Sequence, residues 1–209
     1  MTKTVTRLFD NYSDAERAVH ELEALGVSHD DISILANNSD GSHGAHATGD
    51  GTDPNSHGDI SRGVTTGAAL GGVGGLLAGL GLLAIPGLGP IVAAGWLAAT
   101  AAGAGLGAIG GGATGTIVGA LKDAGHTEDE ANVYSEGVRR GGTLVSARVD
   151  DTLSERAEAA LHSSHGVDAA TRGSVYRKDG WERFDEKAPA YSGDDVNRER
   201  SLYGTGMSI

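Results

Sequence analysis

A segment of 59 residues without a charged side chain constrains this chain more than any other feature of its sequence. It runs from Gly63 to Leu121 and contains 19 glycines. Small residues recur in it at every fourth position, a step that keeps one stripe on one face of a helix. Such a stripe lets two helix backbones come close together, as in small-xxx-small packing. The residues of this double glycine zipper, which we predict to mediate self-association, are Gly63, Gly67, Gly71, Gly75, Gly79, Gly95, Ala99, Gly103, Gly107, Gly111, Gly115 and Gly119.

The zipper is interrupted once, between Ile85 and Pro90, where two prolines and two glycines cannot continue a helix. We therefore predict a helical hairpin with arms over residues 63–85 and 91–121. Each arm has the length to cross a hydrocarbon layer of about 30 Å. In water, however, each glycine costs a helix interior about 0.5–1 kcal/mol relative to alanine. The hairpin thus needs a bilayer or dense packing, against other copies or within the chain. A disordered linker is disfavoured, because the segment lacks serine and keeps a helical period.

The rest of the composition excludes several classes of protein. The net charge of −12 and the lack of a basic stripe argue against nucleic-acid binding. The chain has no cysteine, which excludes disulfides, thiolate zinc sites and iron–sulfur clusters. No apolar signal region follows Met1. We expect a cytoplasmic protein, or one associated with the inner membrane whose globular part lies on the cytoplasmic side.

The sequences on either side of the zipper resemble one another, and each predicts a strand, a helix and a strand. Expected strands span residues 4–10, 31–36, 143–150 and 167–176, from their β-branched residues and partial alternation. Capping boxes at Ser13/Glu16, Thr152/Glu155 and Thr127/Glu130 predict three helix starts. Two βαβ halves form an α+β, ferredoxin-like sandwich, here interrupted by the hairpin and one extra helix.

This prediction divides the chain into five parts. Residues 1–36 form the first βαβ half, 37–62 a flexible polar linker, 63–121 the glycine-zipper hairpin, 122–176 the extra helix with the second half, and 177–209 a tail. The tail lacks a helical or strand period and carries Trp181, Phe184, Tyr191 and Tyr203. We expect it to be disordered, or to dock on the sandwich, on another copy or on a partner.

Several stretches resemble bacterial general stress proteins. The opening Val5-Thr-Arg-Leu-Phe-Asp10, with Ala15 to Val19 and Leu25-Gly26-Val27, resembles the start of heat-induced members. The Gly/Ala hairpin, its proline turn, and Tyr134 to Val145 are similar to relatives called low-temperature-induced or membrane-related. The resemblance covers roughly residues 3–172. It implies stress induction but no reaction, and it carries no catalytic residue over to this chain.

Candidate chemistry is sparse. His43, His46 and His57 lie among aspartates between Asn37 and Ile60 and are weak candidates for a divalent metal, since nothing fixes their orientation. A solvated linker explains them better. Neither a nucleophile elbow nor a phosphate-binding loop occurs.

We therefore expect no enzyme and no cofactor, but a stress-associated homo-oligomer whose hairpin drives membrane insertion or self-association. The alternatives are a soluble oligomeric ferredoxin-like sensor that binds a small molecule, and metal binding through the His/Asp-rich loop.

Overall fold

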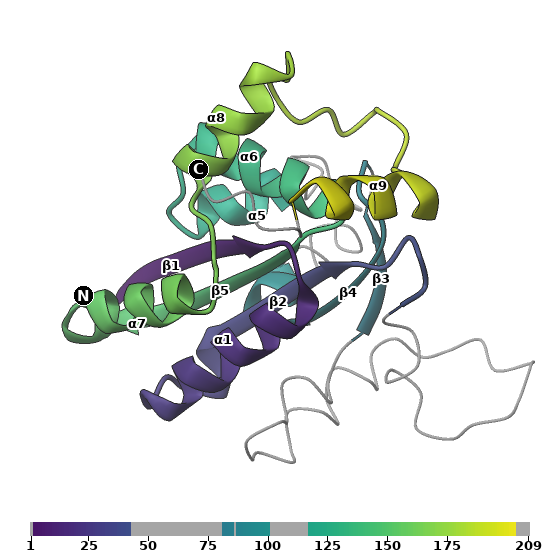
Figure 1. Ribbon diagram of the computed structural model, residues 1–209. Helices are drawn as coiled ribbons and strands as arrows, with labels where there is room; N and C mark the ends of the chain where they lie inside the picture. Colours follow the sequence, from purple (N-terminus) through teal and green to yellow (C-terminus); the bar gives the residue numbers. More distant parts are fainter. Residues whose placement is uncertain (1, 43–80, 86, 101–116, 204–209) are drawn as a thin grey trace, which may run out of the picture.

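A five-stranded antiparallel sheet forms the centre of the protein, of which we describe a computed structural model (Figure 1). The structure describes residues 2–42, 81–85, 87–100 and 117–203. Across the sheet the strands lie in the order β1-β5-β2-β4-β3. Their bounds are β1 Thr2–Phe9, β2 Ile32–Asn37, β3 Gly81–Ile85, β4 Gly89–Gly95 and β5 Thr143–Asp150. The predicted α+β class is confirmed.

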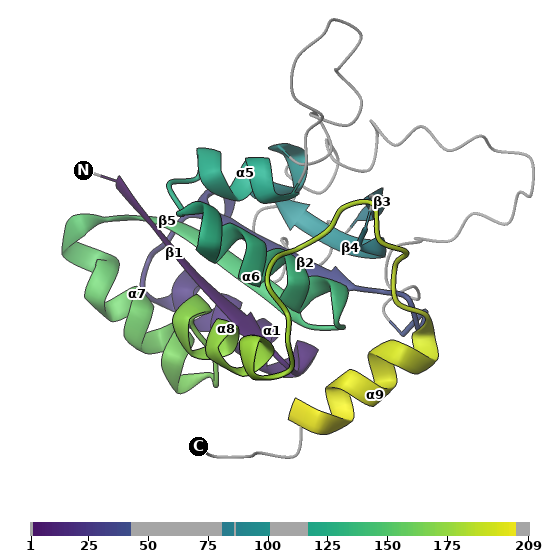
Figure 2. The ribbon, with the colours of Figure 1, turned by 90° about the horizontal axis from the view of Figure 1, so that it is seen from above.

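Helices cover both faces of this sheet, so the domain has three layers (Figures 1 and 2). One face carries α1 (Tyr12–Ala24) and α7 (Asp151–Ser163), and the other carries α5 (Ile117–Asp123), α6 (Glu128–Arg139) and α8 (Ala169–Lys178). Neighbouring residues of a strand point to opposite faces. Accordingly, Leu8 lies in the core beneath α6, and Phe9 in the core beneath α1 and α7. The remaining elements are the short 3₁₀ turn η1 (His29–Asp31) and the C-terminal α9 (Gly193–Tyr203).

Three predicted strands and three predicted helices are present. The strand at 143–150 has the predicted bounds, and those at 4–10 and 31–36 shift by no more than two residues. The capping box at Thr127 is confirmed, because Thr127 Oγ1 accepts from Glu130 N and the Glu130 carboxylate accepts from Thr127 N. The boxes at Ser13 and Thr152 are wrong. Both helices begin earlier, after Asn11 and Asp150, whose side chains make no capping hydrogen bond.

The prediction of a helical hairpin is wrong for the central residues of the uncharged segment, which the structure describes. Residues 81–85 and 89–95 form the β-hairpin β3–β4, and β4 pairs with β2 from Ser33↔Gly95 to Asn37↔Ile91. Only Trp96–Thr100 and α5 are helical among the described residues of the predicted second arm. Pairing with β2 buries Ile91 and Val92 completely. The free energy of this burial outweighs the helix that the four-residue spacing of small residues predicts. Residues 63–80 and 101–116 lie outside the described residues.

The predicted fourth strand, 167–176, is also wrong. Only Val167 pairs with the sheet, in an antiparallel bridge with Leu8. The carboxylate of Asp168 then accepts from Thr171 N at 2.7 Å, which caps α8. The cap starts a helix where β-branched residues had indicated a strand.

Candidate functional site

The predicted zipper residues that the structure describes lie in three different elements. Gly95 ends strand β4, Ala99 is exposed on the helical stretch 96–100, and Gly119 is half-buried in α5. Gly95 is therefore a strand residue and not part of a helical stripe, which corrects its predicted role. The other nine zipper glycines and the three weak metal candidates, His43, His46 and His57, fall outside the described residues.

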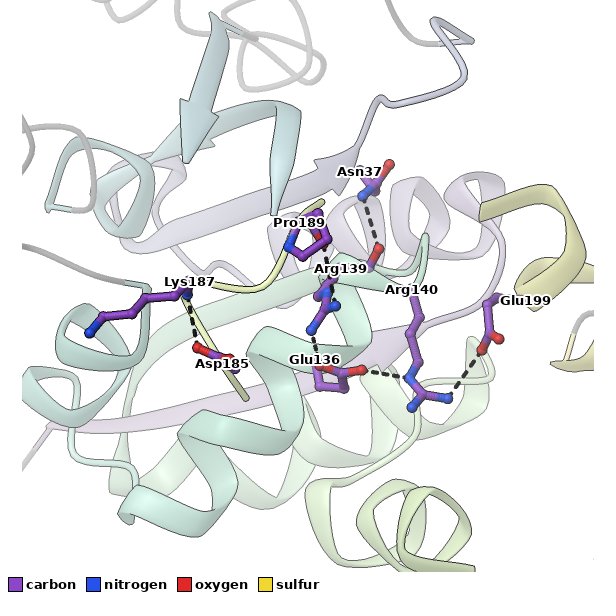
Figure 3. Close-up of polar contacts among 8 residues, drawn as sticks. All are labelled: Asn37, Glu136, Arg139, Arg140, Asp185, Lys187, Pro189 and Glu199. Carbon is purple, nitrogen blue, oxygen red and sulfur yellow. Dashed lines mark hydrogen bonds and ion pairs between the residues drawn. The ribbon is translucent and has the colours of Figure 1, made fainter. Parts of the chain in front are cut away.

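A buried group of charges lies instead where the C-terminal residues meet α6 (Figure 3). Its centre is Glu136, which is 1% exposed. Arg139 and Arg140 follow it by three and four residues, so all three side chains share one face of the helix. Arg140 Nε donates to Glu136 Oε1 at 2.8 Å, and Arg139 Nη1 donates to Oε2 at 3.4 Å. One carboxylate thus holds two guanidinium groups.

The same two arginines bind the C-terminal part of the chain. Arg140 Nη1 donates to Glu199 of α9 at 3.2 Å, and Arg139 Nη2 donates to the carbonyl oxygen of Pro189 at 3.3 Å (Figure 3). We call Glu136, Arg139, Arg140 and Glu199 the Glu136 cluster. With two acids and two bases it carries no net charge, as the burial of charges requires.

Two aromatic rings pack on the arginines of this cluster, and Glu136 keeps Arg140 charged. The Arg140 guanidinium lies 4.4 Å from the ring centre of Tyr176, and that of Arg139 lies 4.9 Å from Tyr191. Burial disfavours the charged form of Arg140, but the hydrogen bond and charge of Glu136 outweigh it and raise the pKa of Arg140. Burial also raises the pKa of Tyr191, which keeps its phenol neutral. Arg140 therefore stays charged and paired with Glu136.

Arg200 of α9 makes a second polar contact with the domain. It donates to the carbonyl oxygen of Gly141 at 2.9 Å and to that of Asn37 at 3.2 Å, and it pairs with the Asp40 carboxylate. Burial works against ionised Asp40, but hydrogen bonds from Ser42 and Arg200 lower the pKa of Asp40. Asn37 in turn donates to the carbonyl oxygen of Arg139 at 3.3 Å, which links both contacts (Figure 3).

A small cavity of about 300 Å³ opens beside the Glu136 cluster. Most of its lining comes from the C-terminal part of the chain, and its polar groups are of both signs. The lining residues are Arg139, Pro189, Ala190, Tyr191, Asp195, Arg198 and Glu199. The carboxylates in this lining are engaged, since Glu199 accepts from Arg140 and Asp195 from Ser192 and Arg198. The arrangement is suited to holding one chain segment against another.

A separate polar group is buried between β1, β5 and the α5–α6 turn. Thr6 Oγ1 lies 2.8 Å from His126 Nε2 and 2.8 Å from Ser146 Oγ. His126 Nδ1 lies 3.8 Å from the Glu130 carboxylate. Thr6 is only 2% exposed and Ser146 is fully buried. These side chains satisfy one another's hydrogen bonds inside the core, and the hydroxyls are not accessible to a substrate.

This group predicts a loss of stability in mild acid. Burial lowers the pKa of His126 below 6.5, although Glu130 acts in the opposite direction. In the unfolded chain His126 has the ordinary pKa of about 6.5, so at a pH between this value and the lower pKa of the folded state it is protonated mainly when the chain is unfolded. The free energy of unfolding therefore falls as the pH falls through this window. Urea unfolding of the wild type and of His126→Gln at pH 7.5, 6.5 and 5.5 measures the effect. The wild type is expected to lose more stability than the variant, and equal losses would show that His126 is not responsible.

Within the described ranges, no group of three or more His, Asp or Glu residues is placed to hold a metal ion. In the same ranges, no helix has the length and apolar character needed to cross a membrane.

The sequence indicates the part of the Glu136 cluster that lies on α6, but not the partner that α9 contributes. Glu136, Arg139 and Arg140 have the spacing of helical ion pairs and follow the helix start that the Thr127/Glu130 capping box predicts. Their partner Glu199 lies 59 positions after Arg140, and no local pattern connects the two.

Comparison with known proteins supplies no relative. No family model, no curated protein and no solved structure matches this chain.

Proposed function

We propose that this chain is a non-enzymatic, stress-associated protein that self-associates through its uncharged segment, residues 63–121. The observation that carries the proposal is the position of β3. This strand comes from the middle of the uncharged segment and is the last strand in the sheet order. Its outer edge therefore has no strand partner among the described residues.

The edge lacks the features that usually prevent association. Exposed edge strands are commonly protected by charges or prolines. Strand β3 contains neither, and its Leu82 side chain is 58% exposed. A second copy that adds its own β3 to this edge would pair with the backbone groups that have no strand partner among the described residues, and would cover Leu82. Self-association is thus favoured over a purely monomeric state.

The finer fold that we propose is a ferredoxin-like sandwich with an added β-hairpin. In its favour, the bridge of Val167 to β1 gives the antiparallel order Val167-β1-β5-β2, with α1 and α7 on one face. The fourth strand is then reduced to one residue. The stress association itself rests on the resemblance of residues 3–172 to general stress proteins.

We expect Leu82→Lys to weaken self-association, because a lysine on an edge strand opposes pairing with a second copy. Light scattering across a concentration series should give a lower mean mass than for the wild type. Ala159→Lys is the control, since Ala159 is exposed on α7, outside both the uncharged segment and the C-terminal residues. If both variants keep the mass of the wild type, the β3 edge is not the contact.

A soluble small-molecule sensor is the second candidate, and the cavity beside the Glu136 cluster favours it. The cavity has both guanidinium and carboxylate groups and a tyrosine ring in its lining. A small zwitterion could bind there by displacing the ion pair between Asp195 and Arg198. A mass that changes only when a ligand is added would favour this candidate over constitutive self-association.

A further inference from the structure

The C-terminal segment, residues 181–203, packs on the turn of the β3–β4 hairpin. We call this segment the strap. Phe184 is 4% exposed and belongs to the same core as the fully buried Leu88 of the turn. A Cβ atom added at Gly87 would lie 2.9 Å from Glu186 Cα, and one added at Gly89 would lie 2.9 Å from Ala190 Cβ. The strap and the turn are therefore in direct contact.

The strap also packs on the residues that follow β2. Arg200 pairs with Asp40, as described above. A Cβ atom added at Gly193 would lie 3.6 Å from Asp40 Cβ. Val196 is fully buried, and a Cβ atom at Gly141 would lie 2.6 Å from its Cγ1 atom. The strap thus holds the chain shortly before position 43 and again shortly after position 80.

The connection between the strap and the rest of the domain allows it to separate. Residues 179–192, between α8 and α9, form neither helix nor strand. In the part of the chain that the structure describes, no strand pairs with the strap, so its release would be a local opening of the kind that folded proteins undergo.

We propose that the strap is an autoinhibitory clamp that holds the β3–β4 hairpin in the sheet and thereby limits self-association. This inference rests on the proposed function, since it concerns what regulates the same surface. Release of the strap removes the cover from Leu88 and frees the turn of an uncharged hairpin. Newly exposed apolar surface next to an open strand edge then favours contact with a second copy.

The test is a disulfide that locks the strap. Asp40→Cys combined with Gly193→Cys places two Cβ atoms 3.6 Å apart, inside the range of about 3.5–4.5 Å found in disulfides. The Cβ atom at position 193 also lies 3.1 Å from Ser39 O and 3.2 Å from Asp40 Cα, so the backbone at residues 39–40 must shift slightly to admit it. The chain contains no other cysteine. Oxidised and reduced forms of one full-length protein can therefore be compared, with the wild type in the same buffers as the control. If the disulfide does not form, Asp40→Asn, which removes the charge that pairs with Arg200, is compared with the wild type in the same measurements.

Hydrogen exchange and light scattering are measured on both forms. The reduced form has lost the ion pair of Asp40, so its strap is released more easily. We expect amides of residues 81–95 to exchange at least roughly tenfold faster than in the oxidised form, and amides of α7, on the far face, to be unchanged. The mean mass should be higher in the reduced form.

Equal exchange of residues 81–95 in the two forms would overturn the clamp. Faster exchange without a change in mass would overturn its inhibitory role. A protein that is monomeric in every form would contradict the proposed function, which requires self-association. The exchange data would then still show whether the strap holds the hairpin, so the two failures can be told apart.

Discussion

Replacing Gly95 by alanine is expected to destabilise the protein by about 3 kcal/mol or more. The backbone at Gly95 has φ +89°, which costs a residue with a side chain roughly 1–2 kcal/mol. The added Cβ atom would also lie 2.1 Å from the Ile32 carbonyl oxygen and 2.7 Å from Ser33 Cα, both in the backbone of β2. A backbone cannot move aside as a side chain does, so overpacking adds roughly 1–3 kcal/mol. Urea or thermal unfolding measures the loss.

Gly26→Ala is the matched control for this prediction. Gly26 has almost the same φ, +88°, but no atom lies within 4 Å of the added Cβ. The control should lose only the conformational part, roughly 1–2 kcal/mol. A glycine zipper makes the opposite prediction for Gly95, because alanine is the better helix former and already occupies zipper position 99. An unchanged or more stable Gly95→Ala variant would contradict strand β4.

Removing the charge of Glu136 is expected to cost about 3–5 kcal/mol, because it leaves the buried Arg139 without a carboxylate partner and Arg140 with Glu199 alone. The side chains of Arg139 and Arg140 are only 14% and 13% exposed, so water replaces the lost partner poorly. Glu136→Gln keeps the shape of the side chain and isolates the effect of the charge. Denaturant unfolding gives the total loss, and hydrogen exchange of residues 193–203 shows whether α9 is released with it.

An exposed ion pair on the same helix provides the comparison. Asp129 pairs with Arg177, and their side chains are 66% and 43% exposed. Asp129→Asn should cost less than about 1 kcal/mol, as exposed pairs generally do. Similar losses in Glu136→Gln and Asp129→Asn would show that the Glu136 cluster does not hold the strap to the domain.

Local signals correctly predicted most helices and strands before and after the uncharged segment, apart from the strand at 167–176 and two of the capping boxes. The apolar residues of α1 follow a helical period, and those of β5 partly alternate along the strand. The Thr127 capping box marks the start of α6. In these elements the local preference and the tertiary packing agree, which is why the sequence alone is sufficient.

The uncharged segment was predicted less well, since its small residues fit a helix and a close strand approach equally. The glycine at position 95 belongs to the four-residue repeat, yet in the fold it lets β4 approach β2 closely. Only pairing with β2, which is distant in sequence, separates the two interpretations. The same limit applies to the candidate site, where Glu199 and Arg200 reach partners far earlier in the chain.

The central claim is that the full-length protein self-associates through its uncharged segment. Its most direct test is fractionation of the untagged protein into soluble, carbonate-washed and detergent-extracted pools, followed by light scattering on the pool that contains it. We predict a soluble particle whose mass is a multiple of the monomer and falls on dilution or with Leu82→Lys. A strictly monomeric soluble protein at every concentration would contradict the account, and recovery only in detergent would place the uncharged segment in a membrane instead.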